Sequence, residues 1–228
     1  MAELPMARVL SPREGRRVRP RLTVLLGPDY SGKSSVLEGL AERGTCTVVS
    51  YDKALLDPVY SLIGRVRDEF LTEALRAPAG RYSSDLFLTV VQIAVVHLRD
   101  RMMDAPPDRP VIVDSYYFKL LAKCSLLGYD NASLFSWWRS FPPPDQVVYL
   151  DVEPAVAWER SGWGAHANPM EHYGEKPTED SFTRFQMDLG EVMAKEMTGL
   201  NVITLGQPDG VEESVDLVEK TIRDGAHG

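Results

Sequence analysis

The residues with the clearest chemical potential lie in one octapeptide, Gly27-Pro-Asp-Tyr-Ser-Gly-Lys-Ser34. Glycines let the backbone curl so that several N–H groups point at phosphate oxygens, and a helix beginning near Lys33 adds the positive end of its dipole. The Lys33 ammonium can then lie against the β- and γ-phosphates of a nucleotide, while the Ser34 hydroxyl can ligate Mg²⁺. The pattern G-x-x-x-x-G-K-[ST] between an apolar strand and a helix predicts a P-loop. The residues expected to hold the donor nucleotide are Gly27, Asp29, Tyr30, Ser31, Gly32, Lys33, Ser34 and Ser35.

A carboxylate follows a second apolar run, at Asp114 directly after Val111–Val113. In P-loop proteins an acidic residue at this place completes the Mg²⁺ side of the site. Ser115 follows, whereas a hydrolytic ATPase or motor usually places a glutamate there to activate water. The Asn-Lys-x-Asp loop of a guanine-specific switch does not occur. An insert rich in Gly, His and Glu over about 161–178 lies where small-molecule kinases carry a lid that excludes water. Among P-loop proteins, these features favour a kinase.

The elements that must position these residues alternate between short apolar runs and amphipathic stretches. None of the apolar runs alternates in polarity, as expected for strands buried on both faces of a parallel sheet. The five predicted strands are Leu22–Leu26, Thr47–Ser50, Val111–Val113, Val147–Leu150 and Val202–Leu205. The predicted helices are Lys33–Arg43, Pro58–Ala77, Ser83–Met103, Ser115–Leu127, Asn131–Ser140, Glu179–Met197 and Val211–Arg223. Repetition of strand and helix predicts an α/β sandwich with right-handed crossovers.

Composition and charge restrict the classes of function. The 228 residues are 44% hydrophobic and 25% charged, typical of one globular domain, which we expect over 21–228 after a flexible leader at 1–20. The formal net charge of −8 disfavours nucleic acid as a partner. Cys46 and Cys124 are too few for a disulfide framework, and we expect buried, reduced thiols. No signal peptide or apolar run of membrane length is recognisable, so we expect a cytoplasmic protein with no membrane partner.

Four stretches spanning about two-thirds of the chain resemble the thymidylate kinase-like branch of the P-loop nucleoside and nucleotide kinases. The P-loop carries Asp29 where that family places an acidic residue that reaches the acceptor's sugar. Val147–Arg160 is similar to the family's Tyr-Leu-Asp-Val segment and its following arginine, and Val111–Ala122 is similar to its Asp-Arg-Tyr strand and helix. Phe182–Gln186 and Asn201–Leu205 are similar to its later helix and last strand. The resemblance implies a five-stranded parallel sheet, Mg·ATP as donor, a nucleotide-like acceptor and a possible homodimer.

The acceptor side departs from the family pattern. Asp114 is followed by Ser115 and Tyr116, so the arginine that grips the acceptor phosphate in the family is missing. Lys119, one helical turn further, could supply that charge, although an ammonium lacks the bidentate fork of a guanidinium. The family's Arg-Glu-Pro loop is also absent. In the helix that stacks on and reads the base, Phe87 could stack on a ring, and Gln92 is the nearest polar candidate for hydrogen bonding. The acceptor-side candidates are Asp29, Asp52, Phe87, Gln92, Tyr116 and Lys119.

Asp52 leaves two interpretations of this departure open. A carboxylate after the second strand faces the γ-phosphate in many kinases that phosphorylate hydroxyl groups, where a base accepts the proton. Asp52 could equally cap the turn that precedes Pro58. The first interpretation favours a hydroxyl acceptor and gives Asp52 a catalytic role.

Charged residues around the insert complete the set of candidates. Arg160 and Arg184 flank it and could counter the charge on the transferring phosphoryl group. His166 and His172 lie within the insert, but their spacing matches no compact zinc pattern, and we expect mobile polar loop residues there.

The sequence therefore predicts a small-molecule kinase that transfers the γ-phosphoryl group of Mg·ATP to a nucleotide-like acceptor. The catalytic candidates are Lys33, Asp52, Asp114, Arg160 and Arg184, with Ser34 and Asp114 as metal ligands. A kinase acting on a hydroxyl of a nucleoside, sugar or specialised metabolite is the alternative within this class. A nucleotide-binding regulator without turnover and a nucleic-acid-repair ATPase are alternatives from other classes.

Overall fold

Five parallel strands form one sheet in the computed structural model, which describes residues 19–77, 81–206 and 210–225. Most of the leader expected at 1–20 lies outside these residues. The strands are β1 (Leu22–Leu26), β2 (Thr47–Val49), β3 (Val111–Asp114), β4 (Gln146–Leu150) and β5 (Val202–Leu205), in the order β2-β3-β1-β4-β5. The five-stranded parallel sheet is as predicted. Because the carboxyl ends of parallel strands share one edge, the segments after β1, β2 and β3 meet there.

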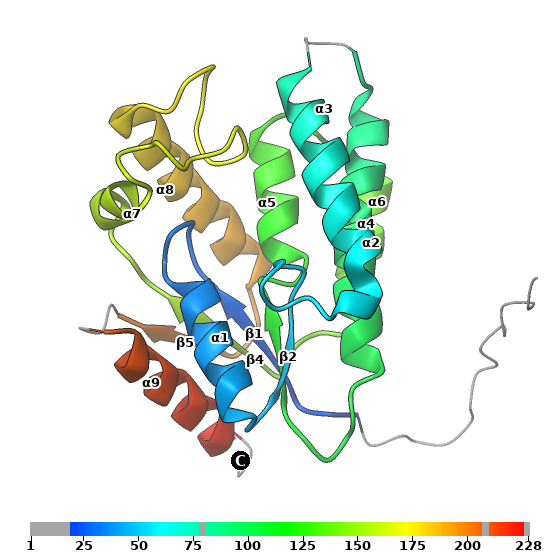
Figure 1. Ribbon diagram of the computed structural model, residues 1–228, viewed down its shortest axis with the longest axis vertical. Helices are drawn as coiled ribbons and strands as arrows, with labels where there is room; N and C mark the ends of the chain where they lie inside the picture. The colour runs from blue at the N-terminus through cyan, green and yellow to red at the C-terminus, as the bar shows by residue number, and fades with distance from the viewer. Residues whose placement is uncertain (1–18, 78–80, 207–209, 226–228) are drawn as a thin grey trace, which may run out of the picture.

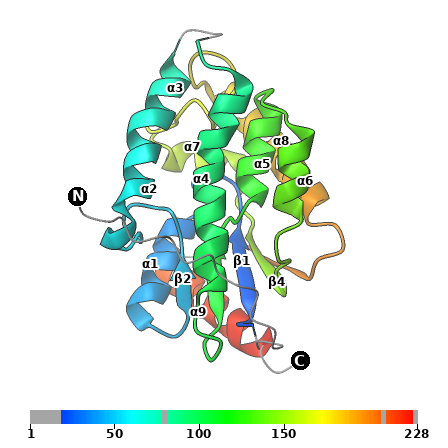
Figure 2. The ribbon, with the colours of Figure 1, turned by 90° about the vertical axis from the view of Figure 1, so that its right-hand side faces the viewer.

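Helices cover both faces of the sheet (Figures 1 and 2). On one face, α1 (Lys33–Arg43) and α9 (Val211–Asp224) pack against inward residues such as Leu25 and Val148. On the other face, Val24 and Val113 lie in a core shared with four helices. These are α4 (Ser84–Met103), α5 (Phe118–Leu126), α6 (Ala132–Arg139) and α8 (Glu179–Glu196). The edge strand β5 differs from the prediction of burial on both faces, because Val202 is 36% exposed.

The segment predicted as one helix over Pro58–Ala77 is divided into four short pieces. They are the 3₁₀ turn η1 (Pro58–Tyr60), α2 (Ser61–Arg65), the π-helical η2 (Val66–Leu71) and α3 (Thr72–Arg76). Together they run alongside α4 (Figure 2). The helix predicted from Ser115 begins at Phe118 instead. Ser115 and Tyr116 both have left-handed φ angles, +55° and +47°, which turn the chain sharply after β3.

The lid insert, residues 161–178, lies between α7 (Pro154–Arg160) and α8 (Figure 1). It contains turns and bends without a helix or strand, yet parts of it are buried. Tyr173 packs edge-on against Phe185 of α8, and its hydroxyl donates to Asp188 at 2.7 Å. His172 is 3% exposed, so the expectation of mobile polar residues is wrong for this part of the insert.

Two further sequence predictions concern the interior and the membrane. Cys46 and Cys124 are both free and buried, as predicted. Burial raises the pKa of the Cys46 thiol to about 11, which keeps it protonated at neutral pH. No helix within the described ranges has the length and apolar character needed to cross a bilayer.

Candidate active site

The P-loop forms a tight turn between β1 and α1 and holds its lysine inside. Gly27 has φ +154°, and a Cβ there would lie 2.6 Å from the Leu150 carbonyl oxygen, so the close approach of β4 requires glycine. The Lys33 ammonium donates to the carbonyls of Gly27 and Pro28 at 3.1 and 2.7 Å and to the Ser31 hydroxyl at 3.0 Å. Burial, together with the nearby Lys119 ammonium, holds the pKa of Lys33 well below its usual value. An anion at this loop would favour the charged form of Lys33.

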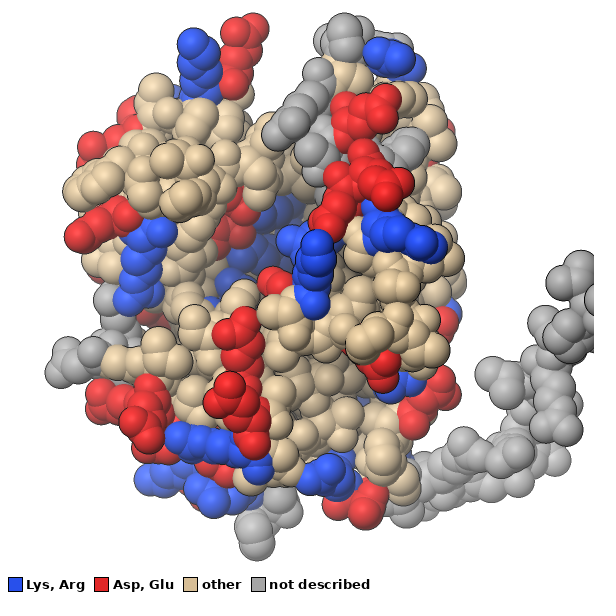
Figure 3. Space-filling model, viewed as in Figure 1, with Lys and Arg blue, Asp and Glu red and all other residues tan. Residues whose placement is uncertain are grey.

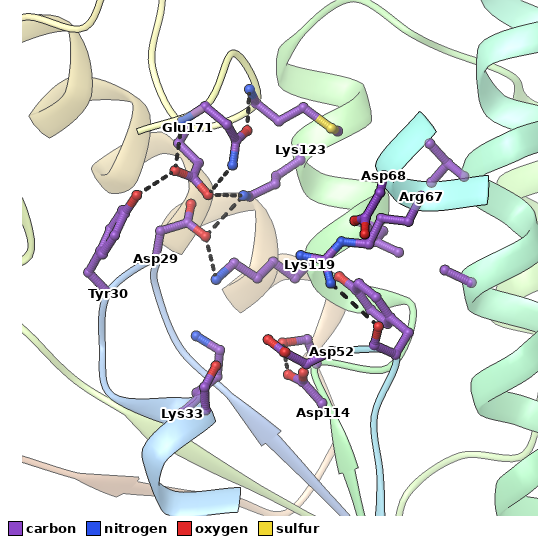
Figure 4. Close-up of a pocket in the computed structure, with 18 of the residues that line it drawn as sticks. Asp29, Tyr30, Lys33, Asp52, Arg67, Asp68, Asp114, Lys119, Lys123 and Glu171 are labelled. Atoms are coloured by element: carbon purple, nitrogen blue, oxygen red, sulfur yellow. Dashed lines mark hydrogen bonds and ion pairs between the residues drawn. The ribbon is translucent and has the colours of Figure 1, made fainter. Parts of the chain in front are cut away.

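Asp29 is buried between two ammonium groups from α5. Lys119 Nζ and Lys123 Nζ lie 2.7 and 2.9 Å from Asp29 Oδ1 (Figure 4). The Gln186 amide donates to Asp29 Oδ2 at 3.0 Å. Burial alone would raise the pKa of Asp29, but Lys119, Lys123 and Lys33 outweigh it and hold that pKa well below the ordinary range. The carboxylate therefore keeps two cations beside the P-loop, one helical turn apart on α5.

Glu171 of the lid insert joins the same cluster. Its carboxylate accepts a hydrogen bond from the Tyr30 hydroxyl at 3.0 Å and lies 3.6 Å from Lys123 Nζ. Burial lowers the pKa of Lys123, but the two carboxylates Asp29 and Glu171 outweigh that effect and raise it. Burial and the adjacent Glu171 charge also raise the pKa of Tyr30 above its usual value. The lid insert is thus connected to the P-loop and to α5 by buried charges.

Asp114 and Asp52 lie beside Lys33 at the ends of β3 and β2 (Figure 4). The Asp114 carboxylate accepts hydrogen bonds from the hydroxyls of Ser50 and Ser115, both at 2.9 Å. Asp52 Oδ1 accepts from the Ala54 backbone N–H at 3.1 Å, which is the turn-capping contact considered from the sequence. Asp52 also lines the cavity described next, so capping and a position at the site coexist.

A cavity of about 600 Å³ opens between the P-loop, the lid insert and the α2–α5 helices. Space filling shows a hollow in this face with basic side chains at its floor and acidic ones near its edge (Figure 3). Its charged lining residues are Asp29, Lys33, Asp52, Arg67, Asp68, Asp114, Lys119, Lys123, Arg160 and Glu171. Ser34, the second expected Mg²⁺ ligand, lines it as well.

A second cavity, of about 610 Å³, lies on the other side of the P-loop. It is bounded by the start of α1, the end of β4 and the start of α9, through residues such as Val36, Leu150 and Val211. The two cavities share the residues Ser31, Gly32, Ser35 and Arg160. Arg160 Nη1 donates to the Tyr30 carbonyl at 3.3 Å, so the guanidinium reaches back over the P-loop. The P-loop is therefore placed to present a phosphate chain from one cavity to a group in the other.

Besides Gly27 in the P-loop turn, four of the predicted site residues do not line either cavity. Phe87 is 2% exposed and stacks on Tyr129 with ring centroids 4.1 Å apart. Tyr116 is fully buried in the core, with its hydroxyl directed at the Pro142 carbonyl. Arg184 lies over the Tyr173 ring and 3.6 Å from Asp180 on the surface of α8. The fourth is Gln92, on α4.

The lining includes residues that were not predicted from the sequence, among them Lys123, Arg67 and Glu171. Lys123 lies one turn after Lys119 on α5, and helical spacing alone could have placed both on one face. Arg67 is on the π-helical η2, whose wider turn shifts side chains off the α-helical spacing. Glu171 is within an insert whose fold no periodicity describes.

The oxygen ligands present suit a divalent metal of the Mg²⁺ type. Ser34 and Asp114 offer a hydroxyl and a carboxylate at the same cavity, which is the donor chemistry that Mg²⁺ prefers beside phosphate oxygens. No group of three or more His, Cys, Asp or Glu side chains that could hold a metal by itself occurs in the described part of the chain.

Comparisons with known proteins agree with this fold. No protein-family model matches the chain. A thymidylate kinase from Schizosaccharomyces pombe is 27% identical over 207 residues, which is 88% of this chain and 92% of that protein.

Two solved structures have a similar fold. A thymidylate kinase from Candida albicans aligns with a TM-score of 0.59 at 15% identity, over 91% of this chain and 93% of its own. A deoxyadenosine kinase from M. mycoides, with dCMP and dCDP bound, aligns with a TM-score of 0.57 at 9% identity, over 89% of this chain and 98% of its own. The sheet with its flanking helices is that of the P-loop nucleotide kinases.

Proposed function

We propose that this chain, a member of the thymidylate kinase-like and deoxynucleoside kinase family, transfers the γ-phosphoryl group of Mg·ATP to the phosphate of a small-molecule acceptor. The observation that carries the proposal is that two cavities meet at the P-loop and share Ser31, Gly32, Ser35 and Arg160. A donor nucleotide in the second cavity would extend its phosphates along the P-loop toward an acceptor in the first. This arrangement supports transfer between two bound molecules.

The chain's own residues would hold the reacting groups as follows. The P-loop amides and Lys33 would bind the donor phosphates, while Ser34 and Asp114 would hold Mg²⁺, which neutralises phosphate charge when bound. Arg160 would counter the charge on the transferring group from the side of α7. An acceptor phosphate oxygen would attack the γ-phosphorus, the bond to the β–γ bridging oxygen would break, and ADP would leave. A dianionic acceptor phosphate carries no proton on the attacking oxygen, so this route requires no base.

Cations near the acceptor support a phosphate there. Lys119 and Lys123 line the first cavity beside Asp29 and could supply the positive charge that the absent arginine of the family pattern would give. Arg67 adds a guanidinium from η2. These groups can together attract an anionic acceptor, although Asp29 and Glu171 already balance part of the lysine charge.

A hydroxyl acceptor is the second candidate, favoured by Asp52. This carboxylate lines the cavity near Asp114 and Lys33, and one of its oxygens is not used in the contact with Ala54. On this route Asp52 would accept the proton that the acceptor hydroxyl must lose.

The proposal is tested by measuring ADP formation from Mg·ATP with panels of monophosphates and of the matching hydroxyl compounds. We expect ADP formation that depends on the acceptor. Its rate should fall about a hundredfold or more in Lys33→Ala, because the ammonium that stabilises the charge on the transferring phosphoryl group is lost. Lys220→Ala, which removes an exposed lysine on α9 away from both cavities, is the matched control and should retain the rate.

The alternatives predict different results in the same assay. Turnover of hydroxyl compounds alone, lost in Asp52→Asn but not in Asp57→Asn, would replace the phosphate acceptor with the hydroxyl route. Asp57 is a fair comparison because its carboxylate caps Val59 in the same loop and lines neither cavity. ATP binding without turnover of either panel would contradict both routes and favour a regulator.

A further inference from the structure

The wall of the first cavity away from the P-loop is mostly apolar. Side chains from α2, η2, α3, α4 and α5 form it, and the charged neighbours Arg67 and Asp68 both belong to η2. No amide or hydroxyl side chain from the described part of α2, α3 or α4 lines the cavity. The apolar lining residues are Ile63, Val66, Leu75, Val90, Val91, Ile93, Ala94 and Leu120.

This wall does not suit a nucleobase. A purine or pyrimidine carries several donors and acceptors on its edges, and each one buried without a partner costs about 1–3 kcal/mol. Gln92, the amide expected to read such an edge, does not line the cavity. Phe87, the ring expected to stack on the base, is stacked on Tyr129 within the core. The wall can instead bury an apolar group. Each apolar carbon that is removed from water makes the free energy of binding more favourable.

Arg67 provides an anchor for an anion at the polar end of the cavity. Its guanidinium lies 5.3 Å from the centre of the Tyr51 ring, and Nη1 donates to the Tyr51 carbonyl at 3.4 Å. Within the described ranges no carboxylate is within ion-pair distance of it, and the neighbouring Asp68 is 3.9 Å from Lys53. A guanidinium can donate two parallel hydrogen bonds to two oxygens of one phosphate. A π-helical turn is rare and is often found at functional sites.

We propose that the acceptor is a phosphate monoester with an apolar organic body, such as an aryl or prenyl monophosphate. Its phosphate would lie near Arg67 and Lys119, within reach of the P-loop, and its body would lie against the α2–α5 wall. This inference rests on the proposed function and names the acceptor class of the same site. Transfer breaks the bond between the β–γ bridging oxygen and the γ-phosphorus and forms one to the acceptor phosphate, giving ADP and an organic diphosphate.

The first measurement compares kcat/KM across three acceptor panels at saturating Mg·ATP. The panels are aryl and prenyl monophosphates (phenyl, naphthyl, dimethylallyl and geranyl), the corresponding alcohols, and the common nucleoside monophosphates. We expect the best apolar monophosphate to exceed every nucleoside monophosphate by at least about tenfold, since a buried base would leave more than one polar atom unpaired.

Two variants on α4 test whether the preference for an apolar acceptor comes from the cavity wall. Ile93→Asn places an amide in the wall at a residue that is 37% exposed, and Leu86→Asn makes the same change at a residue that is 42% exposed but lines neither cavity. Ile93→Asn should raise KM for the apolar acceptor about tenfold and leave KM for ATP unchanged, whereas Leu86→Asn should change neither. Arg67→Ala should raise KM for the monophosphate without affecting ATP binding.

Other outcomes of these assays would each contradict one part of the proposal. A preference for a nucleoside monophosphate would contradict the proposal that the acceptor has an apolar body. Equal KM values for the apolar acceptor in Ile93→Asn and Leu86→Asn would contradict it as well. Turnover of the alcohols alone would contradict the proposal that the accepting group is a phosphate. ATP binding with no ADP formed from any panel would overturn the proposed function itself, and this inference with it. Thermal unfolding of each variant separates loss of folding from loss of binding, and Val90→Asn repeats the test at a second wall position.

Discussion

At the scale of single residues, Asp29 organises the cations of the site. One carboxylate oxygen lies within 3 Å of two ammonium groups, and the other accepts from Gln186. Removing a member of such a buried group leaves charges without compensation, which is costly. Asp29 was predicted from the P-loop motif, but its role in holding Lys119 and Lys123 depends on where α5 packs. That packing involves residues far apart in the chain, so the motif could not predict it.

The free energy of unfolding should fall by about 3–5 kcal/mol in Asp29→Asn at pH 7, because Lys119 and Lys123 lose their counter-charge. The pKa of Asp29 is lower in the folded state than in the unfolded chain. Its contribution to stability is therefore complete above about pH 4 and is lost as the pH falls toward the pKa of the folded state. The difference between wild type and variant should therefore be constant near neutrality and narrow by about 1 kcal/mol at pH 3. Urea unfolding at both pH values measures it. A difference that widens in acid would refute this account.

At the scale of elements, the lid insert is connected by side-chain contacts rather than by backbone pairing. Tyr173 contacts α8, and Glu171 contacts Tyr30 and Lys123. The sequence analysis predicted an insert over about 161–178 and expected mobile polar residues there, whereas parts of this segment are buried. Its buried contacts are between residues with no periodic spacing, so hydrophobic patterning could not reveal them.

Glu171→Gln should loosen the insert by removing the charge that faces Lys123 while keeping the shape of the side chain. Hydrogen bonds to charged groups contribute about 1.5–3 kcal/mol, so amide exchange within 161–178 should quicken about tenfold or more. Hydrogen exchange followed by mass spectrometry would measure this. Glu175→Gln changes an exposed carboxylate of the same insert and should leave exchange as in wild type. Equal exchange in both variants would show that Glu171 does not hold the insert.

The strands and most helices could be predicted because apolar runs and helical periodicity are local properties. β1, β5 and α1 have the predicted bounds. The Pro58–Ala77 segment could not be resolved into η1, α2, η2 and α3 by periodicity, since each piece is shorter than two helical turns of pattern. Arg67, a central residue of the proposed acceptor site, lies in that segment. The least predictable segment thus carries one of the site residues that the sequence analysis missed.

At the scale of the whole molecule, α1 and α9 form the layer that covers one face of the sheet. These helices approach closely at Gly39, where a Cβ would lie 2.7 Å from Val215 Cγ2. Gly39→Val should therefore force the helices apart and lower the free energy of unfolding by about 1–3 kcal/mol. KM for the acceptor should be nearly unchanged. KM for ATP should rise, because Val36, Val211 and Ser214 on the same two helices line the second cavity. Thermal unfolding and steady-state kinetics measure the two effects.

A second substitution checks that the loss in Gly39→Val comes from crowding. Combining it with Val215→Ala should restore much of the stability, whereas Val218→Ala, a deletion in the same helix and core, should add to the loss. Additive losses in both double variants would contradict the crowding explanation.

The phosphate-handling groups and the apolar acceptor wall come from different parts of the chain. The P-loop, Asp52 and Asp114 lie at the carboxyl ends of three strands of the sheet. Most of the wall belongs to α2, η2, α3 and α4, which lie between β2 and β3 in the sequence. A chain organised in this way can acquire a new substrate by change within one contiguous segment, with its transfer chemistry left intact. The residues from 58 to 103 are accordingly the segment to exchange between relatives when redirecting such an enzyme to another acceptor.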